Sequence, residues 1–425
     1  MTDLLPSEIT LPISADVAES LPTPAYVYDV APIRKNRRAL AAALPEGTGL
    51  YYSVKANPHP ALLAEVRASG VRPEVCSAGE LQSALDAGWS GPEILYGGPG
   101  KRDQDVLTAL AAGVTEMSVD SPAGLDQLDA CAQALGVHAR ALLRVNDDTP
   151  TRGQGLAMTG VASQFGADAG WIAAEPARFA GRANVEVVGL HLYMGTNLQS
   201  VDDLCDQFDR SASTAVRVMA ALADCGVRLH RLDLGGGFGA PFAQAGQLST
   251  WPGLAQRLAA ILDATVPGWT AGTPEVVFES GRYLVATAGT LLTRVLDAKD
   301  SHGDRMVILE SGINHLGGMS GMRRLPPLRP ALVPVDGRVG DRPLAPTTIT
   351  GPLCTPLDTW THRAELPELR RGDLVAVPNV GAYGLNASLI GFLGHPLPLE
   401  FVFDADRGSD QPMHVTRQHL VRIPA

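Results

Sequence analysis

The sequence predicts a parallel (β/α)8 barrel of the TIM type, joined to a C-terminal domain that is mostly β. Eight short apolar runs of β type alternate with Ala/Leu-rich amphipathic stretches. No Gly-x-Gly-x-x-Gly follows the first run, which disfavours the competing open, doubly wound sheet. After about residue 285 the helical periodicity fades, and short strand-like pieces separated by Pro and Gly replace it.

The expected barrel domain spans 26–285. It begins with a strand-like run at 25–29 and an Arg/Ala-rich helix at 30–44. Its eight apolar runs are those at 49–54, 73–76, 93–97, 116–119, 140–145, 186–192, 230–234 and 275–279. Because parallel strands need helical crossovers, the amphipathic stretches between these runs are expected to be the covering helices.

Residues 1–25 and 286–425 are expected to form the second domain together. The N-terminal part is Pro-rich and irregular. The strand-like pieces of the C-terminal part lie at 288–297, 306–310, 331–335, 347–349, 373–377 and 414–422. Residues 319–330, which include Arg323 and Arg324, are expected to be an exposed loop.

Composition excludes several classes of function. The formal net charge of −11 argues against nucleic acid or an anionic membrane as the main partner. The five cysteines are scattered without metal-type spacing, so we expect neither a metal site nor a disulfide framework. The N-terminus carries no signal-peptide pattern and no apolar run approaches about 18 residues, so a cytoplasmic location is expected.

Lys55 directly follows the first apolar run, within the stretch Gly49–Pro58. A lysine at this place either pairs with a carboxylate or extends to water, or else it is an amine that forms a Schiff base with a carbonyl cofactor. This stretch alone favours the structural alternative. The chain has only four lysines, however, which makes one in a core strand unusual: Lys35, Lys55, Lys101 and Lys299.

Two later strand ends carry groups that suit a phosphorylated ring cofactor. Gly235, Gly236 and Gly237 follow the seventh run, where backbone N–H groups can converge on a phosphate, although a flexible turn is the alternative. Glu279 and Arg282 follow the eighth run as either a structural ion pair or contacts to a ring nitrogen and a phosphate. With Lys55, these groups describe a site for pyridoxal 5′-phosphate.

The chain resembles the fold-type III pyridoxal-phosphate decarboxylases, an alanine racemase-like group that contains diaminopimelate, ornithine and arginine decarboxylases. Matching motifs run in order through nearly the whole chain. They are Tyr52–Asn57 around the Schiff-base lysine, Glu74–Glu80, Gly235–Gly237, Glu279–Arg282, Gly351–Asp358 (Gly-Pro-Leu-Cys-Thr-Pro-Leu-Asp) and Gly381–Tyr383.

The resemblance implies decarboxylation of an amino acid by a homodimer with shared active sites. Lys55 would hold the cofactor as an internal aldimine, and Glu279 would keep its ring nitrogen protonated. Cys354 and Asp358 would come from the partner subunit as catalytic residues alongside Lys55, with Cys354 as the proton donor. The remaining cofactor contacts implied are Glu74, Tyr193, Thr196, Gly235, Gly236, Gly237, Gly281, Arg282 and Tyr383.

Departures from the family pattern concern the substrate. Tyr193 stands where the family usually has a histidine that stacks on the cofactor ring, and a phenol can stack in the same way. Thr355 stands where an acidic residue commonly reads a distal substrate amine. The arginines of the 319–330 loop either form a solvated basic loop or contact an acidic group. With Thr355, the second alternative fits family members that act on an amino acid tethered to an acyl carrier protein, with Thr355, Arg323 and Arg324 as substrate contacts.

Alternative functions remain open at this point. A free diamino acid, such as diaminopimelate, is the other substrate class. A pyridoxal-phosphate racemase would use the same barrel but needs a second acid or base opposite the lysine, and the motif around Cys354 favours decarboxylation. A non-catalytic relative would be expected to lose Lys55 or Cys354, and both are present.

Overall fold

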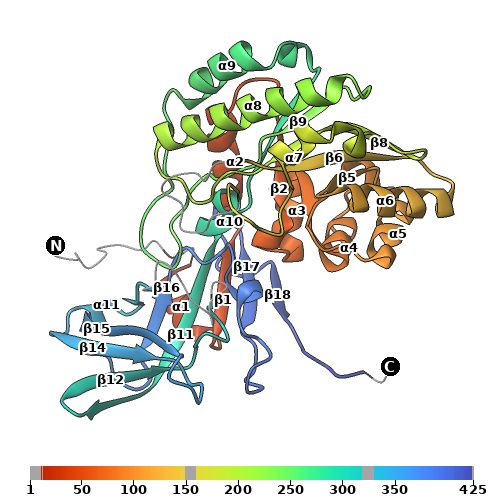
Figure 1. Ribbon diagram of the computed structural model, residues 1–425. Helices are drawn as coiled ribbons and strands as arrows, with labels where there is room; N and C mark the ends of the chain where they lie inside the picture. Colours follow the sequence, from red (N-terminus) through yellow and green to blue (C-terminus); the bar gives the residue numbers. More distant parts are fainter. Residues whose placement is uncertain (1–10, 12, 149–158, 318–329, 424–425) are drawn as a thin grey trace. The chain divides into compact units, whose positions relative to one another are not determined.

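The computed structural model describes residues 11, 13–148, 159–317 and 330–423. These residues form two compact units, each with its own sheet (Figure 1). The barrel unit comprises 36–239 and 249–283, with a gap in description at 149–158, and the β unit comprises the described residues of 1–35, 240–248 and 284–425. Arg323 and Arg324 lie outside the described residues.

The barrel unit contains a closed ring of parallel strands. Its order is β5-β4-β3-β2-β10-β9-β8-β6, and β5 pairs with β6 to complete the ring. The strands are β2 (Gly49–Ser53), β3 (Arg72–Val75), β4 (Leu95–Tyr96), β5 (Glu116–Val119), β6 (Ala139–Asn146), β8 (Val185–Leu192), β9 (Arg231–Asp233) and β10 (Glu275–Glu279). Each lies at a run that the sequence predicts, so the barrel prediction is confirmed. The short strand β7 (Ala167–Asp168) pairs with β6 outside the ring.

Helices follow the barrel strands and lie outside them (Figure 1). Serine residues that follow strands cap three of the helices, because Ser77, Ser121 and Ser200 each accept the backbone N–H three residues later. These caps fix where each strand–helix connection ends. The helices of this unit are α3 (Pro60–Ala68), α4 (Ala78–Asp86), α5 (Asp103–Ala111), α6 (Pro122–Leu135), α7 (Ala169–Ala174), α8 (Val201–Ala223) and α9 (Leu254–Thr265).

The β unit confirms the expected second domain of mostly β structure. Its main sheet has the order β15-β14-β12-β11-β1-β17-β18, and β16 pairs with β11 and β13. Beyond β1 (Ala25–Asp29), the strands are β11 (Gly289–Ser301), β12 (Asp304–Leu309), β13 (Val333–Pro334), β14 (Leu344–Thr350), β15 (Thr359–Pro367), β16 (Leu374–Val377), β17 (Leu399–Phe403) and β18 (His414–Arg417). The sequence did not predict β15 or β17. Short helices α1 (Ala15–Ser20) and α11 (Gly337–Gly340) belong to this unit, and the chain crosses between units in α2 (Ala31–Ala43) and α10 (Arg282–Val285).

Strand β1 lies in the β unit, although a barrel domain starting at residue 26 would include most of it. It pairs antiparallel with β11 and parallel with β17, and all five of its residues are buried. Both of its edges are therefore hydrogen-bonded within this sheet. Its Ala25 and Val27 pack in one core cluster with Ile13 and Ala18 of the N-terminal segment. A local apolar run cannot reveal this choice, because the partners are more than 250 residues away in sequence.

An ionic network lies at the amino ends of the barrel strands. Arg231 donates to the Tyr51 hydroxyl at 2.8 Å and to Glu275 at 2.5 Å, and it also contacts Glu116. The Arg231 side chain is only 12% exposed and that of Glu116 is 6% exposed. Above this network, Tyr51 packs with apolar side chains from other barrel strands, namely Leu95, Leu142, Val188 and Val277.

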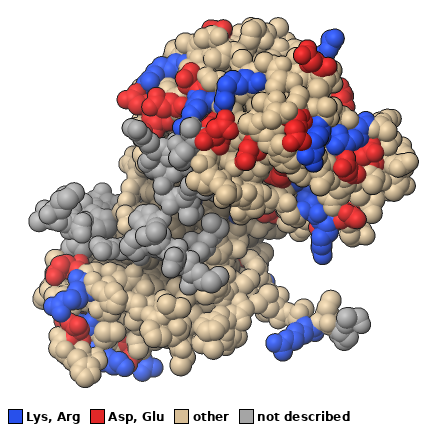
Figure 2. Space-filling model, in the orientation of Figure 1, with Lys and Arg blue, Asp and Glu red and all other residues tan. Residues whose placement is uncertain are grey.

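The surface of the barrel unit carries both signs of charge. Figure 2 shows acidic and basic side chains intermingled over the visible face of this unit. Among the described residues, no helix is both long enough and apolar enough to cross a membrane.

We expect Arg231→Met to destabilise the protein by about 1–3 kcal/mol, because Glu116 and Glu275 lose their least exposed partner. The loss is limited, because Glu116 keeps Arg140 at 2.9 Å and Glu275 keeps Arg72 at 2.5 Å. The control is Arg257→Met, which removes an ion pair with Asp202 whose side chains are 48% and 82% exposed. That change should cost at most about 1 kcal/mol. Urea unfolding followed by circular dichroism measures both, and equal losses for the two variants would contradict the importance of the network.

Candidate active site

Titratable side chains gather at the carboxyl ends of the barrel strands. Lys55 follows β2 in the short 3-10 turn Val54–Ala56, and Glu74 lies near the end of β3. His191 and Asp233 lie at the carboxyl ends of two other barrel strands, β8 and β9. Because parallel strands end at one rim of a barrel, these groups belong to one site.

The Lys55 amine is paired with a buried carboxylate. Its Nζ lies 3.3 Å from Glu74 Oε2 and 3.8 Å from Cys76 Sγ. The lysine side chain is 44% exposed, whereas Glu74 is almost fully buried. Although Lys55 follows a largely buried strand, its own side chain is therefore not buried. Its amine is held at the rim and remains accessible.

Cys76 is a member of this site that sequence reasoning missed. Its thiol donates to Glu74 Oε1 at 2.9 Å, and its backbone N–H donates to Glu80 Oε2 at 2.8 Å. Burial, followed by the Glu74 carboxylate, raises the pKa of the Cys76 thiol well above its usual value. The thiol thus stays protonated at neutral pH and shares the Glu74 carboxylate with the Lys55 amine.

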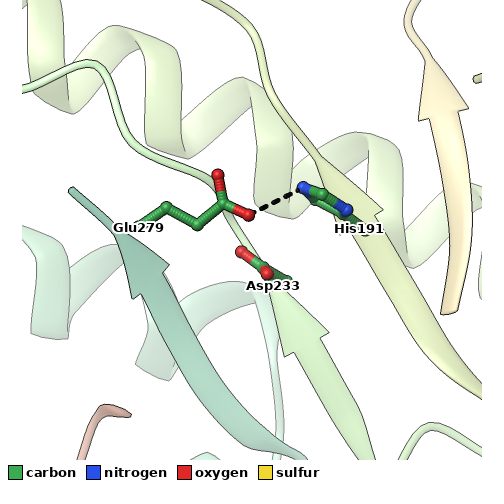
Figure 3. Close-up of side chains that lie close together, drawn as sticks. All are labelled: His191, Asp233 and Glu279. Atoms are coloured by element: carbon green, nitrogen blue, oxygen red, sulfur yellow. Dashed lines mark ion pairs between the residues drawn. The ribbon is translucent and has the colours of Figure 1, made fainter. Parts of the chain in front are cut away.

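Three buried side chains lie close together at the ends of β8, β9 and β10, namely His191, Asp233 and Glu279 (Figure 3). His191 Nε2 lies 3.1 Å from Glu279 Oε1, and His191 Nδ1 lies 2.9 Å from the Ser118 hydroxyl. Asp233 Oδ1 accepts the backbone N–H of Gly235 at 2.8 Å. A signal for Asp233 was present in the sequence, because this carboxylate lies two residues before the glycine run, with Leu234 between them.

Arg144 of β6 supplies the cation nearest to this cluster. Its Nη1 lies 3.1 Å from His191 Nδ1 and also contacts Nε2, and its guanidinium lies 5.5 Å from the centre of the Tyr193 ring. Tyr193 therefore has its ring packed against a cation rather than against water. Arg144 could have been noticed as a charged residue inside an otherwise apolar run.

Burial and neighbouring charges set the ionisation of the cluster. Burial, followed by the Glu279 carboxylate, raises the pKa of Asp233 well above its usual range, which favours its protonated form. Burial also acts to raise the pKa of Glu279, but His191, Lys55 and Arg144 together hold it below its ordinary value. Burial and Arg144 lower the pKa of His191. The pair of carboxyl groups therefore carries one negative charge, on Glu279.

The glycine run after β9 adopts a conformation that other residues rarely reach. Gly235 has φ +70° and Gly237 has φ +111°. A Cβ on Gly235 would lie 2.4 Å from the Leu192 carbonyl oxygen, and one on Gly236 would lie 2.5 Å from the Glu279 carbonyl oxygen. The turn is thus free of side chains and packed against the two strands that carry His191 and Glu279, as a phosphate cradle requires.

These residues fit pyridoxal 5′-phosphate. Glu279 is 2% exposed, and His191 Nε2 lies 3.1 Å from its Oε1. Within the described part of the chain, Oδ2 of Asp233 has no hydrogen-bond partner. A buried carboxylate is costly unless it is compensated, and a protonated pyridine nitrogen would compensate Glu279. His191, Asp233 and Glu279 also have the spacing of metal ligands, but the adjoining Arg144 guanidinium disfavours a divalent cation there.

Other expected cofactor contacts lie in the same unit. Thr196 and Tyr193 follow β8, in a segment that joins the glycine run through the Leu198 N–H, which donates to the Gly237 carbonyl at 2.8 Å. Arg282 begins α10, directly after Gly281. A Cβ on Gly281 would lie 2.7 Å from the Cβ of Ala56, so this turn packs closely against the turn of Lys55.

The remaining expected site residues belong to the β unit. Cys354 is exposed on the turn that follows β14, and Thr355 is half-buried beside it. Tyr383 has φ +55° in the segment after β16. Asp358 is 1% exposed and accepts two backbone N–H groups, so it faces the interior of its own unit.

We expect Asp233→Asn to flatten the dependence of stability on pH. The raised pKa means that folding takes up a proton, so the stability due to this proton is full below the unfolded pKa of about 3.8 and is lost as pH rises towards the folded pKa. The pKa of Glu279 is lowered instead, so this residue changes the dependence of stability on pH only below its ordinary pKa of about 4.3.

Urea unfolding between about pH 5 and pH 8 tests this, since each pH unit in that window changes the stability of the parent by up to about 1.4 kcal/mol. The Asn variant should lack this component. The exposed Asp86→Asn is the control and should keep the slope of the parent. An unchanged slope for Asp233→Asn would mean that Asp233 is ionised in the folded protein.

Comparisons with known proteins agree with this site. The family profile described as "Pyridoxal-dependent decarboxylase, pyridoxal binding domain" matches residues 30–286. The L-glutamyl-[BtrI acyl-carrier protein] decarboxylase of Niallia circulans is 32% identical over 386 residues, which cover 89% of this chain and 88% of the relative. The diaminopimelate decarboxylase of Actinosynnema pretiosum subsp. auranticum is 34% identical over 380 residues, covering 87% and 82%.

A solved structure shares the architecture of both units. The diaminopimelate decarboxylase of Helicobacter pylori, crystallised with L-lysine, superimposes with a TM-score of 0.78 at 26% identity. The match covers 92% of this chain and 93% of that one. Barrel, glycine run, buried carboxylates and family match lead to one conclusion: the chain belongs to the pyridoxal-dependent decarboxylases and is an amino-acid decarboxylase that uses pyridoxal 5′-phosphate.

Proposed function

We propose that the chain removes the α-carboxylate of an amino acid that is tethered to an acyl carrier protein. The observation that carries this proposal is Thr355, next to Cys354. A threonine has no charge to pair with a distal ammonium group, and its Oγ1 already accepts the Leu357 N–H at 3.3 Å within the turn. The relative from Niallia circulans, named for an L-glutamyl carrier-protein substrate, supports the same substrate class.

Lys55 is proposed as the residue that attaches the cofactor. Its exposed amine reaches the rim beside Glu74, which would orient it towards the cofactor aldehyde. Glu279 would keep the ring nitrogen protonated, supported by the burial of its carboxylate and by its pKa, which neighbouring cations hold below the ordinary value. When bound, the cofactor supplies an electron sink for the electron pair that departing CO₂ leaves behind.

The phosphate is proposed to lie against Gly235–Gly237. Thr196 and Arg282 would add a hydroxyl and a guanidinium from the same unit. Tyr193 would pack its ring on the cofactor face, with Arg144 behind it.

Cys354 is proposed as the proton donor to the α-carbon. Its exposure on a turn of the β unit suits a thiol that acts outside its own subunit. We propose that two copies of the chain pair so that the partner's Cys354 completes each site.

A free diamino acid is the second candidate substrate. Diaminopimelate decarboxylases from Pseudomonas fluorescens, Pseudomonas aeruginosa and Actinosynnema pretiosum are 33–34% identical to this chain, slightly more than the carrier-protein enzyme. Overall identity therefore does not separate the two, and the absence of a charge at Thr355 decides our preference.

We expect carrier-tethered glutamate to be decarboxylated with a kcat/KM at least about 100-fold above that of free lysine or diaminopimelate, because a site lacking a partner for their distal ammonium group binds them poorly. Free glutamate should also be slower, because it lacks the binding energy that contacts with the carrier would supply. Release of CO₂ and the mass of the carrier-bound product measure this. Fastest turnover of free diaminopimelate would reject the carrier substrate and leave the decarboxylase assignment intact.

We expect Lys55→Ala to abolish covalent attachment of pyridoxal 5′-phosphate and to reduce activity by about 10²–10⁴-fold, the range for losing a positioned proton-transfer group. Borohydride reduction followed by peptide mass spectrometry should place the cofactor on residue 55 of the parent. Lys299→Ala, at an exposed lysine of the β unit, is the control and should retain both properties. A labelled peptide other than the one with Lys55 would refute the assignment.

A further inference from the structure

The turn that carries Cys354 is held by a single buried carboxylate. Asp358 Oδ2 accepts the Leu353 N–H at 2.9 Å, directly before the cysteine. Asp358 Oδ1 accepts the Ile313 N–H at 2.8 Å, from the segment after β12. The backbone of Asp358 closes the turn as well, because its N–H donates to the Thr355 carbonyl at 3.1 Å and its carbonyl accepts the Gly351 N–H at 2.9 Å.

Two glycines make room for this carboxylate. A Cβ on Gly312 or on Gly351 would lie 2.3 Å from Asp358 Oδ2. The Cβ of residue 351 would also lie 2.4 Å from the Cα of Gly312. The two segments therefore touch backbone to backbone, which is possible only because neither glycine has a side chain. The carboxylate lies where both segments meet.

Asp358 and Cys354 differ in their exposure to solvent, and this difference indicates different roles. Asp358 is 1% exposed, and both of its carboxylate oxygens accept backbone N–H groups of its own unit. It is thus occupied within the fold and turned away from solvent. Cys354, four residues earlier, is exposed. A substrate can reach the thiol, whereas Asp358 can act only through the turn that it fixes.

We infer that Asp358 is a positioning residue, which aims the Cys354 thiol by clamping the 351–358 turn to the segment around Ile313. This replaces the expectation, based on family resemblance, that Asp358 is catalytic. It rests on the proposed role of Cys354. In that role the bond from the α-carbon to the carboxylate breaks, CO₂ leaves, the thiol proton goes to the α-carbon, and solvent returns a proton to the thiolate.

The consequence is a stereochemical signature in D₂O. A fixed thiol delivers its deuteron to one face of the α-carbon, so the product amine of the parent enzyme carries deuterium in one configuration. Asp358→Asn keeps the size of the side chain but sets an amide nitrogen against a backbone N–H. We expect mixed configuration at the α-carbon, a kcat lowered by about 10–100-fold and a KM changed less than about two-fold.

Gly351→Ala provides a second test if Asp358→Asn does not fold. It retains the carboxylate but crowds it, so it should give the same mixed configuration. The controls are Asp336→Asn, where an exposed carboxylate accepts the Arg338 N–H at 2.9 Å, and Gly337→Ala, whose Cβ would meet no atom within 4 Å. Both controls should keep the configuration and kcat of the parent. Uptake of pyridoxal 5′-phosphate by each variant checks that the barrel is intact.

Cys354→Ala separates the two proposals. If this variant keeps the rate and the single configuration of the parent, Cys354 is not the donor and the proposed function loses that step. If Cys354→Ala gives mixed configuration while both Asp358→Asn and Gly351→Ala give a single one, the clamp is overturned and Cys354 stands. Mixed configuration in all three variants, with both controls unchanged, supports the inference.

Discussion

Closure of the barrel by the β5–β6 pairing is the constraint on which the site depends. This pairing runs from Glu116 with Arg140 to Val119 with Leu143 and turns an open row of parallel strands into a ring. In such a ring of parallel strands, the carboxyl ends of strands far apart in sequence surround one rim. Residues 55, 74, 191, 233 and 279 are distant in the chain but belong to one site for this reason. The ionic network of Arg231 stabilises the opposite, amino end.

Three carboxyl groups are buried at the carboxyl-end rim of the barrel. Glu74, Asp233 and Glu279 are all buried, and their charge is limited by sharing. The Cys76 thiol and the Lys55 amine divide the two oxygens of Glu74, while Asp233 keeps its proton next to Glu279. The result is a buried carboxylate at the end of β10, Glu279, that faces His191 at 3.1 Å. A protonated ring nitrogen is the group that completes this arrangement.

In both units, glycines let a carboxylate or a carbonyl group lie directly against a turn, because a glycine has no Cβ. In the barrel unit, Gly235 and Gly236 pack against strand carbonyls beside Asp233 and Glu279. In the β unit, Gly312 and Gly351 pack against Asp358. Without a Cβ, a turn can lie directly on its support, so its position is set by hydrogen bonds instead of by flexible side chains. Reactive groups on such turns are thereby held in place.

The sequence by itself determined the barrel, its eight strands and the cofactor, because these depend on local periodicity and on residues adjacent within short motifs. Only the tertiary structure decided which distant groups share a proton or a hydrogen bond. It brought Cys76 and Glu74 to Lys55, joined Arg144 to His191, and took Asp358 into the interior of its unit. Strand β1 shows the same limit: its apolar run predicts a strand, but pairing with β11 and β17 depends on residues that no local pattern connects to it.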